Sequence, residues 1–224
     1  EAVLVEDERE LGAILLDIGA RTTDYAVFER GALVACGGVP LGGEHVTRDI
    51  AHAFGAPLKD AERIKTLYGA ALTGAGDENK LVDIPQLGGE GEVMRISRAE
   101  LCAVITPRLE EVFELAAEKL PSDSRAMHGV RRLILTGGGS LLIGARETAE
   151  RILKMKTRLG RPTGLAGAPD AATAPQFAVC AGLIQLAAKQ KEERIDPRAT
   201  PIAPMRAAGG GLLAGVGQWL KENF

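Results

Sequence analysis

The stretch GAILLDIGARTTDYAVFERGALVACGGVPLGG, residues 12–43, decides the fold of this chain. It opens with a short apolar run that ends in Asp17 and Gly19, as a buried strand does before a loop. A polar turn leads to a second apolar run, and Gly31 lies in a tight turn before a third. The pattern predicts three consecutive strands at residues 12–19, 22–28 and 32–38.

Helical and strand patterns alternate through the rest of the chain, which predicts an α/β fold. A Ser97/Glu100 capping box opens the longest predicted helix, in which Pro107 is expected to cause a kink or a break. Pro175 suits the first turn of the last core helix. The predicted helices lie at residues 44–54, 60–68, 98–120, 145–155 and 175–189, and the further strands at 81–84, 93–96, 131–136 and 156–159.

The composition is ordinary for a globular protein of 224 residues, and a formal net charge of −3 gives no reason to expect nucleic acid as a partner. The three cysteines form no CxxC pair, which indicates reduced thiols in a cytoplasmic protein, and the three histidines show no metal-ligand spacing. No apolar run reaches the roughly 18 residues that a membrane-spanning helix needs. Because the chain begins with Glu1 rather than methionine, we expect a fragment or a processed product.

Asp17 and the turn after it suit a ligand that carries phosphate. The Asp17 carboxylate could hold hydrated Mg²⁺, and Gly19 would let backbone amides approach anionic oxygens. Thr22 and Thr23 add hydroxyl donors. An ordinary hairpin with a polar tip explains the same residues.

A second glycine-rich turn follows another apolar strand. Gly137, Gly138 and Gly139 would let a flat or charged ligand approach the backbone, although a plain strand-to-helix turn fits as well. Ligands of open α/β sheets bind beyond the carboxyl ends of strands, so two such turns in one chain favour a binding site. Glu62 and Lys65, on one face of a helix, could frame an adenosine or could form a solvated ion pair.

The last residues carry a separate signal. Residues 190–211 are charged and then rich in proline, alanine and glycine, which predicts a flexible linker. The segment 212–224 places its large apolar side chains on one helical face, which predicts an amphipathic helix that binds a membrane surface reversibly. A terminal helix docked on the core is the alternative, which the loose linker disfavours. The apolar residues are Leu212, Leu213, Val216, Trp219, Leu220 and Phe224.

Four stretches of the chain together resemble one family. LLDIGARTTDYAVF, VPLGGEHVTRDIAHAFGAPLKDAERIKTLYGAAL, PRLEEVFELAAEKL and LTGGGSLLIG resemble, in family order, the FtsA family of bacterial actin-like cell-division proteins, and VGQWLKENF resembles its membrane-targeting tail. The resemblance implies an actin-like ATPase fold (ribonuclease H-like) with a large subdomain at residues 1–54 and 98–189. It places a small inserted α+β subdomain at 55–97, and it implies that this chain holds the second half of that fold.

The resemblance assigns a role to each candidate site, with ATP and Mg²⁺ as cofactors. Asp17 would hold Mg²⁺ through water, and it is the one candidate catalytic residue. The family usually has glycine where this chain has Ala20 and Arg21, so Arg21 either supplies a charge to the phosphates or blocks the usual loop shape. The resemblance also implies that the fold closes its nucleotide between two halves, of which this chain would hold the second, so we expect this chain to bind ATP weakly at best and not to hydrolyse it. The other residues matched to the nucleotide site are Gly19, Thr22, Thr23, Gly43, Glu62, Lys65, Gly137, Gly138 and Gly139.

The resemblance also implies partners. The insert would receive the C-terminal peptide of FtsZ, the tubulin-like division protein, through cations among Lys80, Arg95, Arg98 and Arg108, although scattered solvated charges are an alternative for each. The expected protein is a scaffold that self-associates into filaments, recruits other division proteins and lies on the cytoplasmic face of the inner membrane at the division site. The rival interpretations are a kinase or nucleotide hydrolase of the same superfamily, a pilus-assembly adaptor and a shape-determining filament protein.

Overall fold

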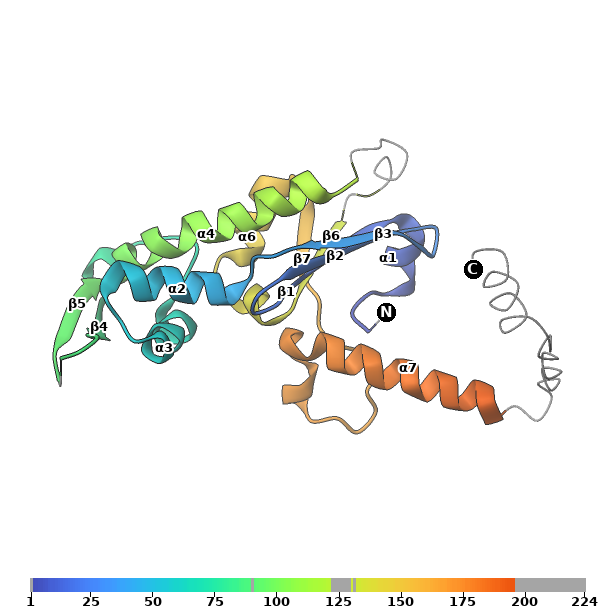
Figure 1. Ribbon diagram of the computed structural model, residues 1–224. Helices are drawn as coiled ribbons and strands as arrows, with labels where there is room; N and C mark the ends of the chain where they lie inside the picture. The colour runs from blue at the N-terminus through green and yellow to red at the C-terminus, as the bar shows by residue number, and fades with distance from the viewer. Residues whose placement is uncertain (1, 90, 122–129, 131, 196–224) are drawn as a thin grey trace, which may run out of the picture. The chain divides into compact units, whose positions relative to one another are not determined.

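A five-stranded mixed sheet forms the base of the structure, a computed structural model that describes residues 2–89, 91–121, 130 and 132–195 (Figure 1). The strand order is β3-β2-β1-β6-β7; β1 pairs antiparallel with β2, and β6 lies parallel to both β1 and β7. The predicted strands are confirmed to within two residues at each end that the structure describes. They are β1 (Ala13–Ile18), β2 (Thr23–Glu29), β3 (Ala32–Val39), β6 (Arg132–Thr136) and β7 (Lys156–Leu159).

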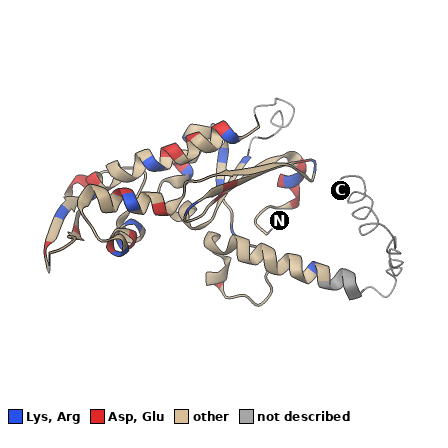
Figure 2. Cartoon of the chain, in the orientation of Figure 1, with Lys and Arg blue, Asp and Glu red and all other residues tan. Residues whose placement is uncertain are grey.

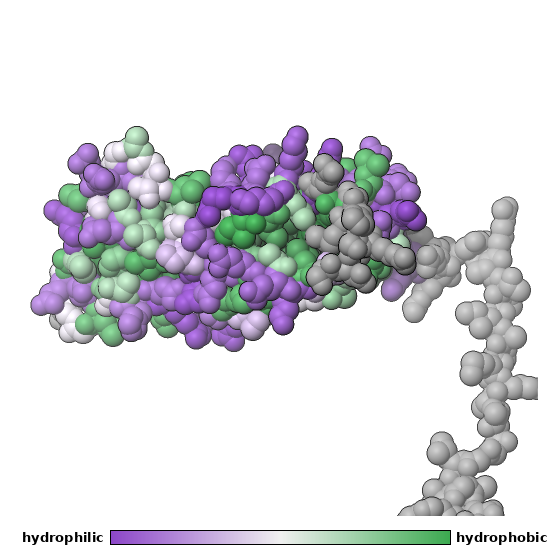
Figure 3. All heavy atoms as spheres, turned by 90° about the horizontal axis from the view of Figure 1, so that it is seen from above, coloured by the Kyte–Doolittle hydropathy of each residue, from purple (hydrophilic) through white to green (hydrophobic). Residues whose placement is uncertain are grey.

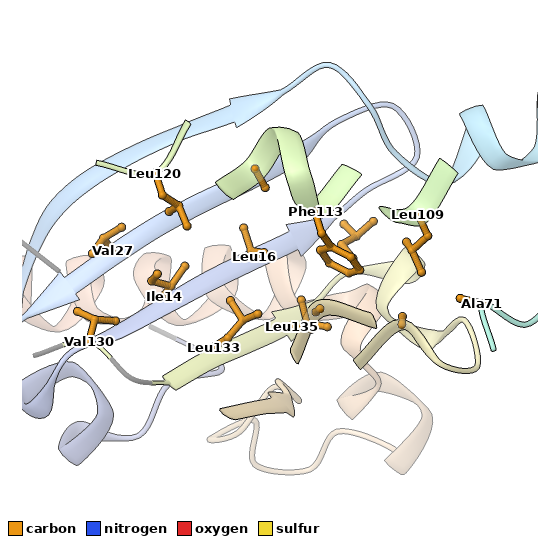
Figure 4. Packing of buried hydrophobic residues seen from close by; sticks show 14 residues of the cluster. Ile14, Leu16, Val27, Ala71, Leu109, Phe113, Leu120, Val130, Leu133 and Leu135 are labelled. Carbon is orange, nitrogen blue, oxygen red and sulfur yellow. The ribbon is translucent and has the colours of Figure 1, made fainter. Parts of the chain in front are cut away.

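The main hydrophobic core lies between this sheet and two helices, α4 (Arg98–Lys119) and α6 (Ala145–Leu153). Because side chains alternate along a strand, Ile14 and Leu16 of β1 point into this core beside residues of β6, while Phe113 of α4 packs onto them (Figure 4). The opposite face, with Ala13, packs on the segment before α1 (Glu6–Leu11) and on the start of α7 (Ala178–Ile195). The sheet is thus covered on both faces.

A second core lies around the predicted insert. It is made by α2 (Gly43–Phe54), α3 (Leu58–Tyr68) and the hairpin of β4 (Leu81–Pro85) and β5 (Val93–Ser97), together with the beginning of α4. Ile50 of α2 and Leu101 of α4 are fully buried in it, so this core extends beyond the predicted boundaries at 55 and 97 on both sides. The predicted boundaries were set by changes in composition along the chain. The core is set by packing, and the apolar faces of α2 and α4 pack against the insert.

Helix α4 begins where the sequence predicts, but it does not break at its proline. Ser97 Oγ accepts from the Glu100 amide at 3.2 Å, and the Glu100 carboxylate accepts from the Ser97 amide at 2.7 Å, which completes the capping box. The helix continues through Pro107 as one element, so the predicted interruption is wrong. Buried Ile105 and Leu109 on either side are held in the two cores, and this packing outweighs the lost backbone hydrogen bond.

The chain divides into two units, residues 1–185 and 186–224. Helix α7 crosses that division and ends at Ile195, so the predicted linker does not start at residue 190. Residues 190–195, QKEERI, are mostly good helix formers, which explains the longer helix. The rest of the predicted linker and the apolar segment 212–224 lie outside the described residues. In the part of the chain that is described, no helix is both long and apolar enough to cross a membrane.

Charges of both signs are mixed along α2, α3 and α4 (Figure 2). Many pair locally, as in the exposed Arg63–Asp60 pair of α3 at 3.6 Å. On the face shown in Figure 3, hydrophilic residues surround separate hydrophobic patches. Such a surface is typical of a globular protein, and exposed single apolar residues on it need no special explanation.

Candidate functional site

The two glycine-rich turns meet at one end of the sheet. Strands β1 and β6 run parallel with Asp17 opposite Thr136, so the turns that follow them leave the same edge. A pocket of about 410 Å³ opens there, with Gly19 on one wall and Gly138 on another. Glu62 and Lys65 of α3, Gly43 of α2 and Gly139 also line it, and its apolar wall includes Leu109, Val112, Leu141, Leu142 and Ile143.

Three of the other predicted residues, Arg21, Thr22 and Thr23, belong to the loop beside the pocket but are not on its wall. Thr22 Oγ1 donates to the Asp24 carboxylate at 3.0 Å. Thr23 is buried, and its hydroxyl donates to the Leu41 carbonyl at 2.9 Å. The Thr23 hydroxyl proton therefore holds the loop in shape and is not directed to a ligand.

The first two glycines of the triple glycine differ in their surroundings. The fold requires glycine at position 137, whereas position 138 has room for a side chain. Gly137 has φ +81°, and a Cβ there would lie 2.5 Å from the Ile18 carbonyl oxygen and would also meet the Asp17 carboxylate. At Gly138 the nearest atom to an added Cβ is Gln176 Cβ at 3.8 Å. Gly137 thus lets the turn pack onto the end of β1, whereas Gly138 leaves room on the pocket wall.

Lys65 joins the helices α2 and α3 at the pocket. Its ammonium group donates to the Gly43 carbonyl at 2.9 Å, to Thr47 Oγ1 at 2.8 Å and to Glu62 Oε2 at 2.7 Å. Thr47 also donates to Glu62. Burial acts to raise the pKa of Glu62, but the hydrogen bonds from Lys65 and Thr47 outweigh it, and the pKa lies below its usual range. The Glu62–Lys65 pair is thus a fixed, charged part of the pocket wall. Thr47 belongs to the same hydrogen-bond network, although it was not predicted from the sequence.

The loop after β1 rests on the beginning of α2. The Gly43 amide donates to the Gly19 carbonyl at 2.9 Å, and the Glu44 amide donates to the Ala20 carbonyl at 2.7 Å. A Cβ at Gly42 would lie 2.6 Å from the Gly19 carbonyl oxygen, so a side chain there would separate the two segments. These two helix amides are therefore used within the chain.

Asp17 and Asp24 face each other as cross-strand partners on β1 and β2. Burial, and then the charge of Asp24, raises the pKa of Asp17. Within the described residues the Asp17 carboxylate has no hydrogen-bond or ion-pair partner. A carboxylate of this kind fits a hydrated cation, which would relieve both effects. Asp24 was not predicted as a site residue, although it directly follows Thr22 and Thr23 in the sequence.

The candidate partner-binding cations all have acidic partners in the structure. Arg98 Nη1 donates to both oxygens of the buried Asp77 at 2.7 and 2.8 Å, and Lys80 reaches the same carboxylate at 3.0 Å. Arg95 pairs with Asp83 at 2.7 Å. The fourth cation, Arg108 of α4, joins two helices, because it binds Asp49 of α2 at 2.5 Å; it also binds Glu111. Among the described residues no group of three His, Cys, Asp or Glu side chains is placed to hold a metal ion.

Comparison with solved structures defines the class of fold. The chain is similar to the crystal structure of MreB5 of Spiroplasma citri bound to ADP, with a TM-score of 0.66 at 18% identity, covering 87% of this chain and 59% of that one. The fold is therefore that of the actin-like proteins. At this identity the likeness concerns the fold alone.

The family follows from sequence. Residues 14–182 match the family of the cell division protein FtsA. The chain is 38% identical to the cell division protein FtsA of Agrobacterium fabrum and 34% identical to that of Escherichia coli K12, over all of this chain and 51% and 54% of those proteins. This chain belongs to the FtsA family of cell-division proteins, and it spans about half the length of these curated relatives.

Proposed function

We propose that this chain is part of an actin-like cell-division scaffold that binds ATP with Mg²⁺ in the pocket beside β1 and β6. The observation that carries the proposal is the convergence of Gly19, Gly138 and the Glu62–Lys65 pair on that one pocket. A volume of about 410 Å³ lies within the range of pockets that hold small ligands, and apolar walls with few fixed polar groups are typical of them.

The residues present fit the nucleotide. The open wall at Gly138 and the apolar side chains around Leu142 suit the flat adenine base, and Glu62 and Lys65 offer an acceptor and a charge to the sugar side. Asp17 would hold Mg²⁺ through water, and the ion would neutralise phosphate charge. Nucleotide binding in such a scaffold controls assembly.

The remaining parts of the proposal rest on family membership and on the sequence. The scaffold tethers FtsZ filaments through the FtsZ C-terminal peptide, self-associates, and recruits later division proteins. Its C-terminal apolar segment attaches it to the cytoplasmic face of the membrane. Because the free chain is expected to bind ATP weakly, the test needs a method suited to weak ligands.

Titration of the ¹⁵N-labelled chain with MgATP, followed by amide chemical shifts, is such a test. We expect the largest shifts at Gly19, Gly43 and Gly138, and a saturable response. Gly138→Met fills the pocket wall and should abolish the response. Gly182→Met is the matched control, because an added Cβ there also finds its nearest neighbour at 3.8 Å, yet Gly182 is not on the pocket wall.

Two outcomes would count against the proposal. One is a chain whose spectrum does not change with MgATP. The other is a saturable change in residues outside the pocket that survives the Gly138→Met substitution.

A further inference from the structure

An ion pair stands at the rim of the pocket. Arg21 Nε donates to Glu44 Oε2 at 2.6 Å, and Arg48 Nη2 donates to the other Glu44 oxygen at 2.7 Å. Glu44 lines the pocket, and Arg21 lies in the loop whose carbonyls bind the first amides of α2. The carboxylate is thus shared between two guanidinium groups, one from the loop and one from the helix.

The pair is held loosely. The Arg21 side chain is 78% exposed, and only its Nε donates to a described residue, so its terminal nitrogens have no partner there. Exposed ion pairs contribute little to stability because both charges remain solvated. Arginine often binds phosphate through two parallel N–H donors, and the terminal nitrogens of Arg21 are available for such a contact.

Several other donors around this loop are engaged. The three N–H groups of Lys65 bind within the α2–α3 network, the Gly43 amide binds the Gly19 carbonyl, and Thr23 binds Leu41. Arg21 and Arg48, which share Glu44, each keep donors that bind no described residue, and Arg21 is the one of the two that lies in the loop itself.

We propose that Arg21 is the polyphosphate-recognising residue of this pocket, and that Glu44 competes with the nucleotide for it. This inference rests on the proposed function and adds to it a selectivity: the pair sets affinity for the charged part of the ligand and leaves the nucleoside part alone. Without nucleotide Arg21 pairs with Glu44; with ATP it transfers to the phosphates, and Glu44 keeps Arg48.

The inference is tested by comparing MgATP with adenosine on the whole chain. Arg21→Ala should lower MgATP affinity about tenfold, the loss of one charge-assisted bidentate contact, and leave adenosine affinity within about twofold. Glu44→Gln should raise MgATP affinity, because it frees Arg21. In the unchanged chain the Arg21 Nε–Hε resonance should move with MgATP and not with adenosine.

Arg95→Ala is the matched control, since the Arg95–Asp83 pair is also exposed, has a 2.7 Å contact and lies away from the pocket. It should leave both affinities unchanged. In the double variant Arg21→Ala/Glu44→Gln, the gain from Glu44→Gln should disappear. A gain that persists would show that Glu44 acts by repelling phosphate or by restraining Arg48, and it would overturn the inference.

Failure of the inference and failure of the proposed function give different results. MgATP binding in the pocket that Arg21→Ala leaves intact overturns the inference alone. A chain that binds neither MgATP nor adenosine overturns the proposed function, and the inference falls with it.

Discussion

Gly19 and Gly138 lie on the wall of one pocket, although the first follows β1 and the second follows β6. The parallel pairing of these strands is what brings the two turns together, since residues far apart in the chain leave the sheet at the same edge. Helices α2 and α3 close the pocket with the Glu62–Lys65 pair. The proposed nucleotide site depends on this convergence.

Gly137 should be the glycine of the second turn that the fold cannot replace. Gly137→Ala places a methyl group against the Ile18 carbonyl and forces alanine to φ +81°, so we expect a loss of at least about 2 kcal/mol in unfolding free energy. Gly138→Ala, at an open position, should leave stability nearly unchanged. Urea unfolding of both variants checks this; equal stability of the two would contradict the assigned turn geometry.

Lys65 should support both stability and nucleotide binding. Lys65→Met leaves Glu62 and the Gly43 carbonyl without their shared donor, and we expect a loss of about 1 kcal/mol after allowing for the half-exposed Glu62. Lys59→Met, at an exposed position of the same helix, is the control and should change neither property. If Lys59→Met and Lys65→Met behave alike in urea and in the MgATP titration, the network has no special role.

Asp77 should make the stability of the second core depend on acid pH. The Gly74 amide, and then Arg98 and Lys80, hold the pKa of Asp77 well below its usual range. A carboxyl whose pKa is lower in the folded than in the unfolded state stabilises the fold above the unfolded value of about 4, and this stabilisation fades as pH falls below it.

Asp77→Asn should therefore lower the urea midpoint at pH 7 and flatten its decline below about pH 4. The control is Asp83→Asn, which breaks the exposed Arg95 pair and should have a much smaller effect at pH 7. A midpoint that is the same for Asp77→Asn and Asp83→Asn at pH 7 would mean that Asp77 does not hold this region together.

The three thiols should react in two classes. Cys36 and Cys180 are exposed, whereas Cys102 is buried in α4, and its burial raises the pKa of its thiol. A colourless disulfide reagent that releases a coloured thiolate should thus titrate two thiols quickly in the native chain and the third only after unfolding. Three fast thiols would place Cys102 at the surface.

Deleting residues 212–224 should abolish sedimentation with liposomes and leave binding of the FtsZ C-terminal peptide intact. In the proposed scaffold the apolar residues of this segment supply the affinity for the membrane interface, while the predicted peptide contacts lie around Arg108 and the β4–β5 hairpin. The unshortened chain provides the reference. Equal sedimentation of both chains would refute the membrane role.

Most of the helices and strands could be predicted from the sequence, because short stretches of residues are enough to specify them. The apolar run of β1, bounded by Gly12 and Gly19, and the Ser97/Glu100 box each specify their element without help from distant residues. The helix α1 was not predicted, since EDEREL carries no apolar period, and it is tied down by a distant ion pair between Glu8 and Arg158.

Glycine and charge spacing in the sequence pointed to segments that line one pocket in the structure. The sequence did not predict their contacts, because only tertiary structure shows that Thr23 turns inward to Leu41 and that Arg98 is occupied by Asp77. These partners are separated widely along the chain, and no local pattern specifies them. The same holds for Glu44, whose hold on Arg21 depends on how the loop meets α2.

Titration with ATP carrying Mn²⁺ in place of Mg²⁺ tests the central claim most directly, because the paramagnetic ion broadens the amide resonances near it. We predict the strongest broadening at Asp17, Gly19 and Gly138. We predict none at Gly31, which follows the last residue of β2, whereas the loop with Gly19 precedes its first residue. Broadening of the Gly31 region with sharp resonances at Gly19 and Gly138 would contradict the account.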